Sequence, residues 1–155
     1  MSNINWKKLI ISIAVPLLTG ILSSLITGNN MAEFELITKP PLSPPGFLFP
    51  IVWTILYILM GISYYIVSET NGKNSGEAKL LYWLQLIVNF FWSIIFFNLK
   101  AYTFAVLWTV LLLILVIAMT RSFFKVKLIA GYLQIPYVIW VAFATYLTIA
   151  IRILN

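Results

Sequence analysis

Residues 80–99 read LLYWLQLIVNFFWSIIFFNL and contain no charged side chain. A helix needs about 20 mainly apolar residues to cross the hydrocarbon of a bilayer. Four further runs come near or exceed that length: 9–26, 49–67, 101–120 and 128–154. The five runs use nearly all of a 155-residue chain that is 62% hydrophobic and 9% charged. The sequence therefore predicts an all-α integral membrane bundle of five transmembrane helices, a single domain over 1–155 with its longest loop at 27–48.

The charged residues lie between these runs or close to their ends. The four acidic residues all fall between runs: Glu33, Glu35, Glu69 and Glu77. Ionisable groups at membrane depth usually mark ion paths and proton relays. Their absence from the middle of the runs argues against proton-coupled transport, though not against passive passage. The chain also lacks Cys and His, which excludes disulfides, zinc sites and haem iron ligated by those residues. We expect no metal site.

The basic residues are unevenly divided between the two sides of a five-span topology. Seven share one side: Lys7, Lys8, Lys73, Lys79, Arg121, Lys125 and Lys127. Three share the other: Lys39, Lys100 and Arg152. By the positive-inside rule, this excess predicts that the N-terminus is cytoplasmic. The membrane topology therefore accounts for the net charge of +6, and no nucleic-acid partner is needed to explain it. No A-x-A-type cleavage site follows the first run, so we interpret it as a retained helix. We also expect the protein to lie in a bacterial plasma membrane.

The connections differ in length and character. Lys100 is predicted to form a tight turn, and residues 121–127 are predicted to link the fourth and fifth helices. The loop 27–48 contains KPPLSPPG at 39–46, where prolines prevent a helix and favour extended backbone. This stiff segment could lie across the mouth of the bundle as a lid, or it could only set the spacing of the helices. Pro50 is expected in the first turn of the second helix.

Polar residues inside the third run follow a helical stripe. Gln85, Asn89, Trp92 and Phe96 are spaced by four, three and four residues, which places them on one face of a helix. The two amides should face the protein interior, because lipid would leave their donors and acceptors unpaired. They could join helices by hydrogen bonds, or they could contact a ligand.

Two other helices carry aromatic residues at similar spacing. The second has Trp53, Tyr57, Met60 and Tyr64, and the fifth has Pro136, Trp140 and Ala144. Trp and Tyr are common at membrane interfaces, but Trp53 and Trp140 lie within their runs. Aromatic faces around Asn89 predict a cavity for a planar hydrophobic ligand; packing between helices is the alternative. Gly20 and Ser24 form a small-xxx-small pair, which we interpret as helix packing within the bundle.

These motifs resemble those of the translocator protein (TspO/MBR) family, which includes the bacterial tryptophan-rich sensory proteins and the mitochondrial peripheral-type benzodiazepine receptors. The matching patterns are Lys39-Pro40 and Pro44-Pro45-Gly46 before Trp53, QLxxNxxWxxxFF at 85–97, and PYxxWxxFAxxL at 136–147. They occur in the same order and register along essentially the full chain.

The resemblance implies a five-helix bundle, usually a homodimer, that needs no cofactor. It further implies binding of porphyrins such as protoporphyrin IX and haem, and of isoquinoline and benzodiazepine ligands; sterol binding is associated with animal members. Asn89 would orient the ligand, aromatic side chains would stack on it, and Ala144 would leave room for its ring. The ligand-binding residues carried over are Phe34, Pro44, Pro45, Trp53, Tyr57, Asn89, Trp92, Trp140, Phe143 and Ala144.

The loop departs from the family pattern. Leu42 stands where many members have Trp, Glu33-Phe34 aligns with a Trp-Tyr pair, and Thr148 replaces an Asn. Two functions follow from the resemblance: a tetrapyrrole sensor, scavenger or carrier, and an enzyme that degrades protoporphyrin IX in light, with Trp53 and Trp140 as candidate redox-active side chains. A passive small-molecule transporter is a third possibility. Lys39 is a candidate partner for porphyrin propionates.

Overall fold

The computed structural model describes residues 3–28 and 30–155, and the side chains of Met31 and Glu33 lie outside that description. Within it the chain forms helices α1 (Trp6–Thr27), α2 (Asn30–Phe34), α3 (Leu48–Glu69), α4 (Ser75–Ser93), α5 (Tyr102–Val126) and α6 (Leu128–Leu154). A π-helical segment, η1 (Ile94–Asn98), continues α4. Five of these helices, counting α4 with η1 as one, are long and apolar enough to cross a membrane. This confirms the predicted all-α bundle with five candidate spans.

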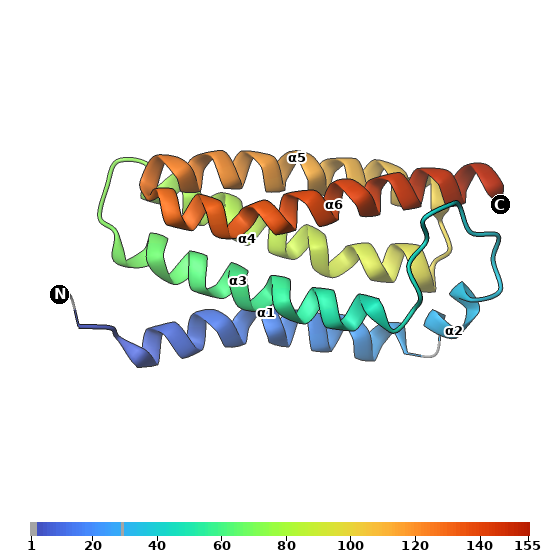
Figure 1. Cartoon of the computed structure of the whole chain (residues 1–155), viewed down its shortest axis with the longest axis horizontal. Coiled ribbons are helices and arrows are strands. Elements are labelled where there is room, and N and C mark those ends of the chain that lie inside the picture. Colours follow the sequence, from blue (N-terminus) through green and yellow to red (C-terminus); the bar gives the residue numbers. More distant parts are fainter. Residues whose placement is uncertain (1–2, 29) are drawn as a thin grey trace.

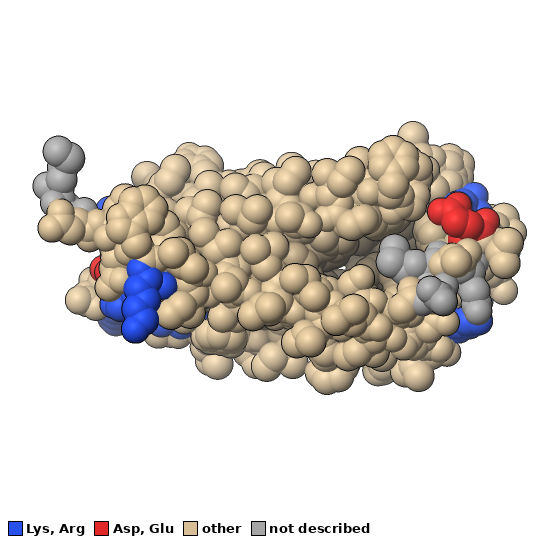
Figure 2. Space-filling view, turned by 90° about the horizontal axis from the view of Figure 1, so that it is seen from below, with Lys and Arg blue, Asp and Glu red and all other residues tan. Residues whose placement is uncertain are grey.

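The long helices lie side by side along the longest axis of the molecule (Figure 1). α1 packs along α3, α5 packs along α6, and α4 contacts both pairs. The N-terminus lies at one end of the bundle and the C-terminus at the other, as an odd number of spans requires (Figure 1). α2 and the segment 35–47 lie at the C-terminal end, which we call the loop end. Lys and Arg gather at the two ends, and the surface between them is uncharged on the face seen in Figure 2.

Local chemistry fixes most helix ends. The Asn5 side chain accepts a hydrogen bond of 3.1 Å from the backbone N–H of Lys8 and so caps α1 at its start. At the other end α1 is capped by Gly28, which has a positive φ of 53°. Pro50 lies in the first turn of α3, where no intrahelical donor is lost. Lys100 has φ of 50° in the short turn between η1 and α5, as predicted.

Two connections differ from the sequence expectation. α5 continues to Val126, so the predicted 121–127 link is reduced to Lys127 in extended backbone. Residues 121–126 stay helical because Ser122 and Phe123 are buried and because Lys125 suits the C-terminal end of a helix dipole. The loop 27–48 also contains the short helix α2, which its proline content does not suggest.

The core lies between α3, α4, α5 and α6, with large side chains such as Met60, Tyr82 and Phe123 almost fully buried. α1 is different, because its buried residues are only Ser12, Pro16, Ser23 and Thr27. It approaches α3 closely at Gly61, where an added Cβ would lie 2.6 Å from the backbone oxygen of Ser12. α1 therefore combines a close backbone contact with α3 at Ser12 with only partly buried apolar side chains, Val15 and Leu17, against the core.

Gly61→Ala should lower the free energy of unfolding, because the new methyl group would overlap the α1 backbone, and overpacking costs about 1–3 kcal/mol. Thermal unfolding in detergent measures this. Gly72→Ala is the matched control, since nothing lies within 4 Å of a Cβ at Gly72. Equal melting temperatures for the two variants would contradict the close α1–α3 contact.

Candidate functional site

A cavity of about 470 Å³ lies between α1, α3 and α4, toward the loop end. Its volume falls within the roughly 300–1,000 Å³ typical of small-molecule sites. The surface is hollowed toward that end on the face seen in Figure 2. The residues that line the cavity are Leu17, Gly20, Ile21, Ser23, Ser24, Leu25 and Thr27 of α1; Phe49, Pro50, Trp53, Thr54 and Tyr57 of α3; and Asn89, Trp92, Ser93 and Phe97 of α4 and η1.

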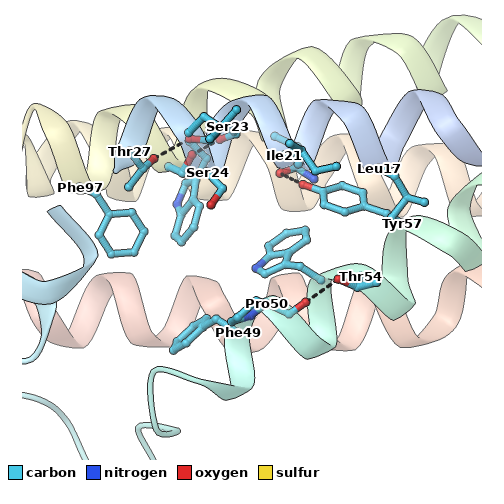
Figure 3. A pocket seen from close by; sticks show the side chains of 16 residues that line it. Leu17, Ile21, Ser23, Ser24, Thr27, Phe49, Pro50, Thr54, Tyr57 and Phe97 are labelled. Carbon is cyan, nitrogen blue, oxygen red and sulfur yellow. Dashed lines mark hydrogen bonds between the residues drawn. The ribbon is translucent and has the colours of Figure 1, made fainter. Parts of the chain in front are cut away.

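The α3 wall of the cavity is aromatic. Trp53 and Tyr57 are one turn apart, and their ring centroids lie 5.4 Å apart. Figure 3 shows the Phe49 ring at one end of this wall and Tyr57 at the other. The facing wall includes Trp92, whose indole N–H donates a 2.9 Å hydrogen bond to Thr109 of α5. This bond fixes the indole and leaves its ring surface for packing.

Asn89 joins three helices beside the cavity. Its amide nitrogen donates to the Tyr137 hydroxyl of α6 at 2.9 Å, and its amide oxygen accepts from the Tyr57 hydroxyl of α3 at 3.4 Å. The Tyr137 hydroxyl in turn donates to Gln85 at 2.7 Å. Gln85 is fully buried and Asn89 is 4% exposed. Both amides therefore join helices, and Asn89 keeps spare capacity, because a carboxamide has two donors and two acceptor sites.

Hydroxyl groups cover part of the α1 wall. The Ser23 hydroxyl hydrogen-bonds the Ser93 hydroxyl of α4, and the Thr27 hydroxyl donates to the backbone oxygen of Ser23 at 2.8 Å. Both contacts appear as dashed lines in Figure 3, where the Ser24 side chain points into the cavity. Gly20 adjoins the Tyr57 ring, which an added Cβ would overlap. Small residues thus make the space between α1 and α3.

Comparison with known proteins gives the same family that the motifs indicate. The TspO/MBR family pattern matches residues 12–154. The chain is 35% identical over 152 residues to a tryptophan-rich protein TspO of Archaeoglobus fulgidus, covering 97% of this chain and 99% of that one. The chain belongs to the TspO/MBR family.

Other relatives in the family come from bacteria and animals. A tryptophan-rich sensory protein of Cereibacter sphaeroides is 34% identical over 122 residues, covering 79% of this chain and 76% of its own length. The translocator protein of Sus scrofa is 31% identical over 143 residues, covering 90% of this chain and 85% of its own. Membership agrees with the five membrane-spanning helices.

The family's expected site residues divide into two groups in this structure. Trp53, Tyr57, Asn89 and Trp92 line the cavity. Trp140, Phe143 and Ala144 of α6 are not among the described lining residues. The Trp140 ring instead packs against Phe49 and Phe143, with ring centroids 5.8 Å away in each case. Phe49 thus lines the cavity and also contacts Trp140.

The loop residues of the family pattern lie at the loop end. The Phe34 ring packs edge-on against Phe49 and Phe97, at 5.9 Å from each. Pro44 is half-buried and Pro45 exposed, and neither lines the cavity within the described part of the chain. Leu42 is exposed, and the side chain of Glu33 lies outside the described residues.

The α1 wall was not predicted as part of a site. Its signal in the sequence was the Gly20–Ser24 pair, which we interpreted as helix packing. Gly20 does lie against the Tyr57 ring, but Gly20 and Ser24 also line the cavity. Small residues are compatible with either role, because each leaves space that a neighbouring helix or a ligand can occupy.

Asn89→Ala should destabilise the bundle by about 1–3 kcal/mol, because the Tyr57 hydroxyl loses its acceptor and the Tyr137 hydroxyl keeps only its bond to Gln85. Tyr57→Phe removes only the longer 3.4 Å bond and should have the smaller effect. Melting temperatures in detergent compare the two. A larger loss for Tyr57→Phe would contradict the central position of Asn89.

Proposed function

We propose that the cavity binds porphyrins, such as protoporphyrin IX and haem, and similar flat hydrophobic molecules. The protein would act as a tetrapyrrole sensor, scavenger or carrier. The observation that supports this is a cavity of about 470 Å³ that lies toward the loop end of the bundle and has indole and phenyl rings on two walls. Its described lining contains no Lys, Arg, Asp or Glu, so the enclosed part of a ligand must be uncharged.

The shape of the cavity supports a planar ligand. Trp53 of α3 lines the same cavity as the small residues Gly20 and Ser24 of α1, and the Ser24 side chain points into the cavity (Figure 3). Aromatic walls favour flat rings, which they contact with offset-stacked or edge-on geometry. The remaining capacity of Asn89 and the Ser24 hydroxyl could hydrogen-bond the polar centre or edge of such a ring.

A cavity-filling variant tests the proposal. Ser24→Phe should weaken the binding of protoporphyrin IX at least about tenfold, because the phenyl group would occupy the space of the ligand, and a tenfold loss needs only about 1.4 kcal/mol. The measurement is a dark titration of the detergent-solubilised protein, followed by tryptophan fluorescence quenching.

The matched control is Leu22→Phe, which adds a ring to the same helix at a side chain that is 53% exposed and does not line the cavity. It should bind like the unaltered protein. Quenching that never saturates, or that is the same for both variants, would show that the cavity does not bind porphyrin.

We also propose a bacterial plasma membrane location, an N-terminus in the cytoplasm and a homodimeric state. The charge distribution supports the orientation. The N-terminal end of the bundle carries seven Lys and Arg and the loop end three. Basic residues are enriched on the cytoplasmic side of membrane proteins. In this orientation the cavity lies nearer the outer surface.

Single cysteines report the orientation directly, because the chain has none of its own. Leu42→Cys at the loop end should react with a membrane-impermeant thiol reagent in intact cells. Asn71→Cys, in the α3–α4 connection, should react only after the membrane is permeabilised. Both side chains are exposed, so the reverse labelling pattern would mean the opposite orientation.

A further inference from the structure

A second cavity, of about 320 Å³, lies at the loop end of the bundle. α2 and the segment after it form one side, and η1 with the start of α5 forms the other. Its described lining includes Phe34, Phe97, Lys100 and Tyr102. Phe97 also lines the first cavity, so this side chain borders both spaces and forms a partition between them.

The π-helical segment positions this partition. Phe96 is buried and packs against Tyr102 of α5, with ring centroids 5.4 Å apart. Phe97, the next residue, is half-buried and lies edge-on to Phe34 and Trp92, at 5.9 and 6.1 Å. Figure 3 shows the Phe97 ring at the end of the first cavity. π-helical turns occur often at functional sites, and here the turn places adjacent residues in the core and between the cavities.

The two cavities differ in charge. The described lining of the first has no Lys, Arg, Asp or Glu, whereas the second includes Lys100, together with the amide of Asn30 and the phenol of Tyr102. The Asn30 amide is held by a 3.1 Å hydrogen bond to Asn98. Lys100 already makes an interaction within the chain. An acidic group of a ligand would therefore either add to that interaction or replace it.

The other nearby lysine has a different role. The Lys39 ammonium pairs with the Glu35 carboxylate at 2.5 Å and lies 5.0 Å from the centre of the Phe34 ring. Its side chain is only 25% exposed. Lys39 therefore holds the loop against α2, and it does not line either cavity within the described part of the chain.

We propose that the second cavity is a subsite for the acidic substituents of the ligand, with Lys100 as the cation that receives them. The inference rests on the proposed function and specifies its ligand: a flat apolar ring system that carries carboxylates on one edge. The ring occupies the first cavity, and the carboxylate edge passes Phe97 into the second. A carboxylate cannot stay ionised in an apolar cavity without a partner, and it gains charge-assisted hydrogen bonds from an ammonium group.

The test compares protoporphyrin IX with its dimethyl ester, which keeps the ring and removes both negative charges. Lys100→Gln should weaken binding of the acid about three- to tenfold, as expected for loss of a partly solvated charged contact. It should leave binding of the ester within about twofold. Raising the salt concentration should weaken binding of the acid to the unaltered protein and have little effect on Lys100→Gln, because salt screens exposed charges.

Two control variants locate the effect. Lys127→Gln, in the α5–α6 connection at the opposite end, and Lys39→Gln, at the same end, should both keep the acid-to-ester affinity ratio of the unaltered protein. A ratio that Lys100→Gln does not change, or that Lys39→Gln changes instead, would overturn the assignment of Lys100 while porphyrin binding itself stands. Failure of both acid and ester to bind saturably would overturn the proposed function and this inference with it.

Discussion

The hydrogen bonds of Asn89 determine the arrangement on which the first cavity depends. One carboxamide contacts hydroxyls from α3 and α6 while it sits on α4, and Gln85 extends the network one turn along the helix. In a bilayer these polar groups find no water, so they must pair inside the protein. The pairing fixes which faces of α3 and α4 turn inward, and it thereby directs Trp53 and Trp92 toward the space beside α1.

α1 forms the side of that space that faces α3 and α4. Its buried residues are small or polar, and it approaches the α3 backbone closely at Gly61. Toward the loop end the buried α1 residues are Ser23 and Thr27, and small and aliphatic α1 side chains line the cavity with α3 and α4. α1 still contacts the network on α3, α4 and α6, because Gly20 lies against the Tyr57 ring and the Ser23 hydroxyl hydrogen-bonds the Ser93 hydroxyl of α4.

The loop end combines several features in a short distance. The π-helical turn, the reversal at Lys100 and the aromatic cluster around Phe34 lie together at the second cavity. The loop has fewer aromatic residues than the family pattern, yet Phe34 retains three ring contacts, to Phe49, Phe96 and Phe97. The Pro44–Pro45 segment lies at the same end, and within the described part of the chain it lines neither cavity.

The sequence alone determined the five spans, the positions of the short connections except 121–127, and the inward direction of Gln85, Asn89, Trp53 and Tyr57. These follow from local rules, because a bilayer fixes span length, excludes charge from its interior and requires polar groups to face protein. Only the tertiary structure decided that α1 rather than α6 completes the wall of the cavity, and that Lys100 rather than Lys39 lines the neighbouring space. Those outcomes depend on how closely helices and loop approach one another, as in the α1–α3 contact at Gly61. Helical periodicity carries no information about such distances.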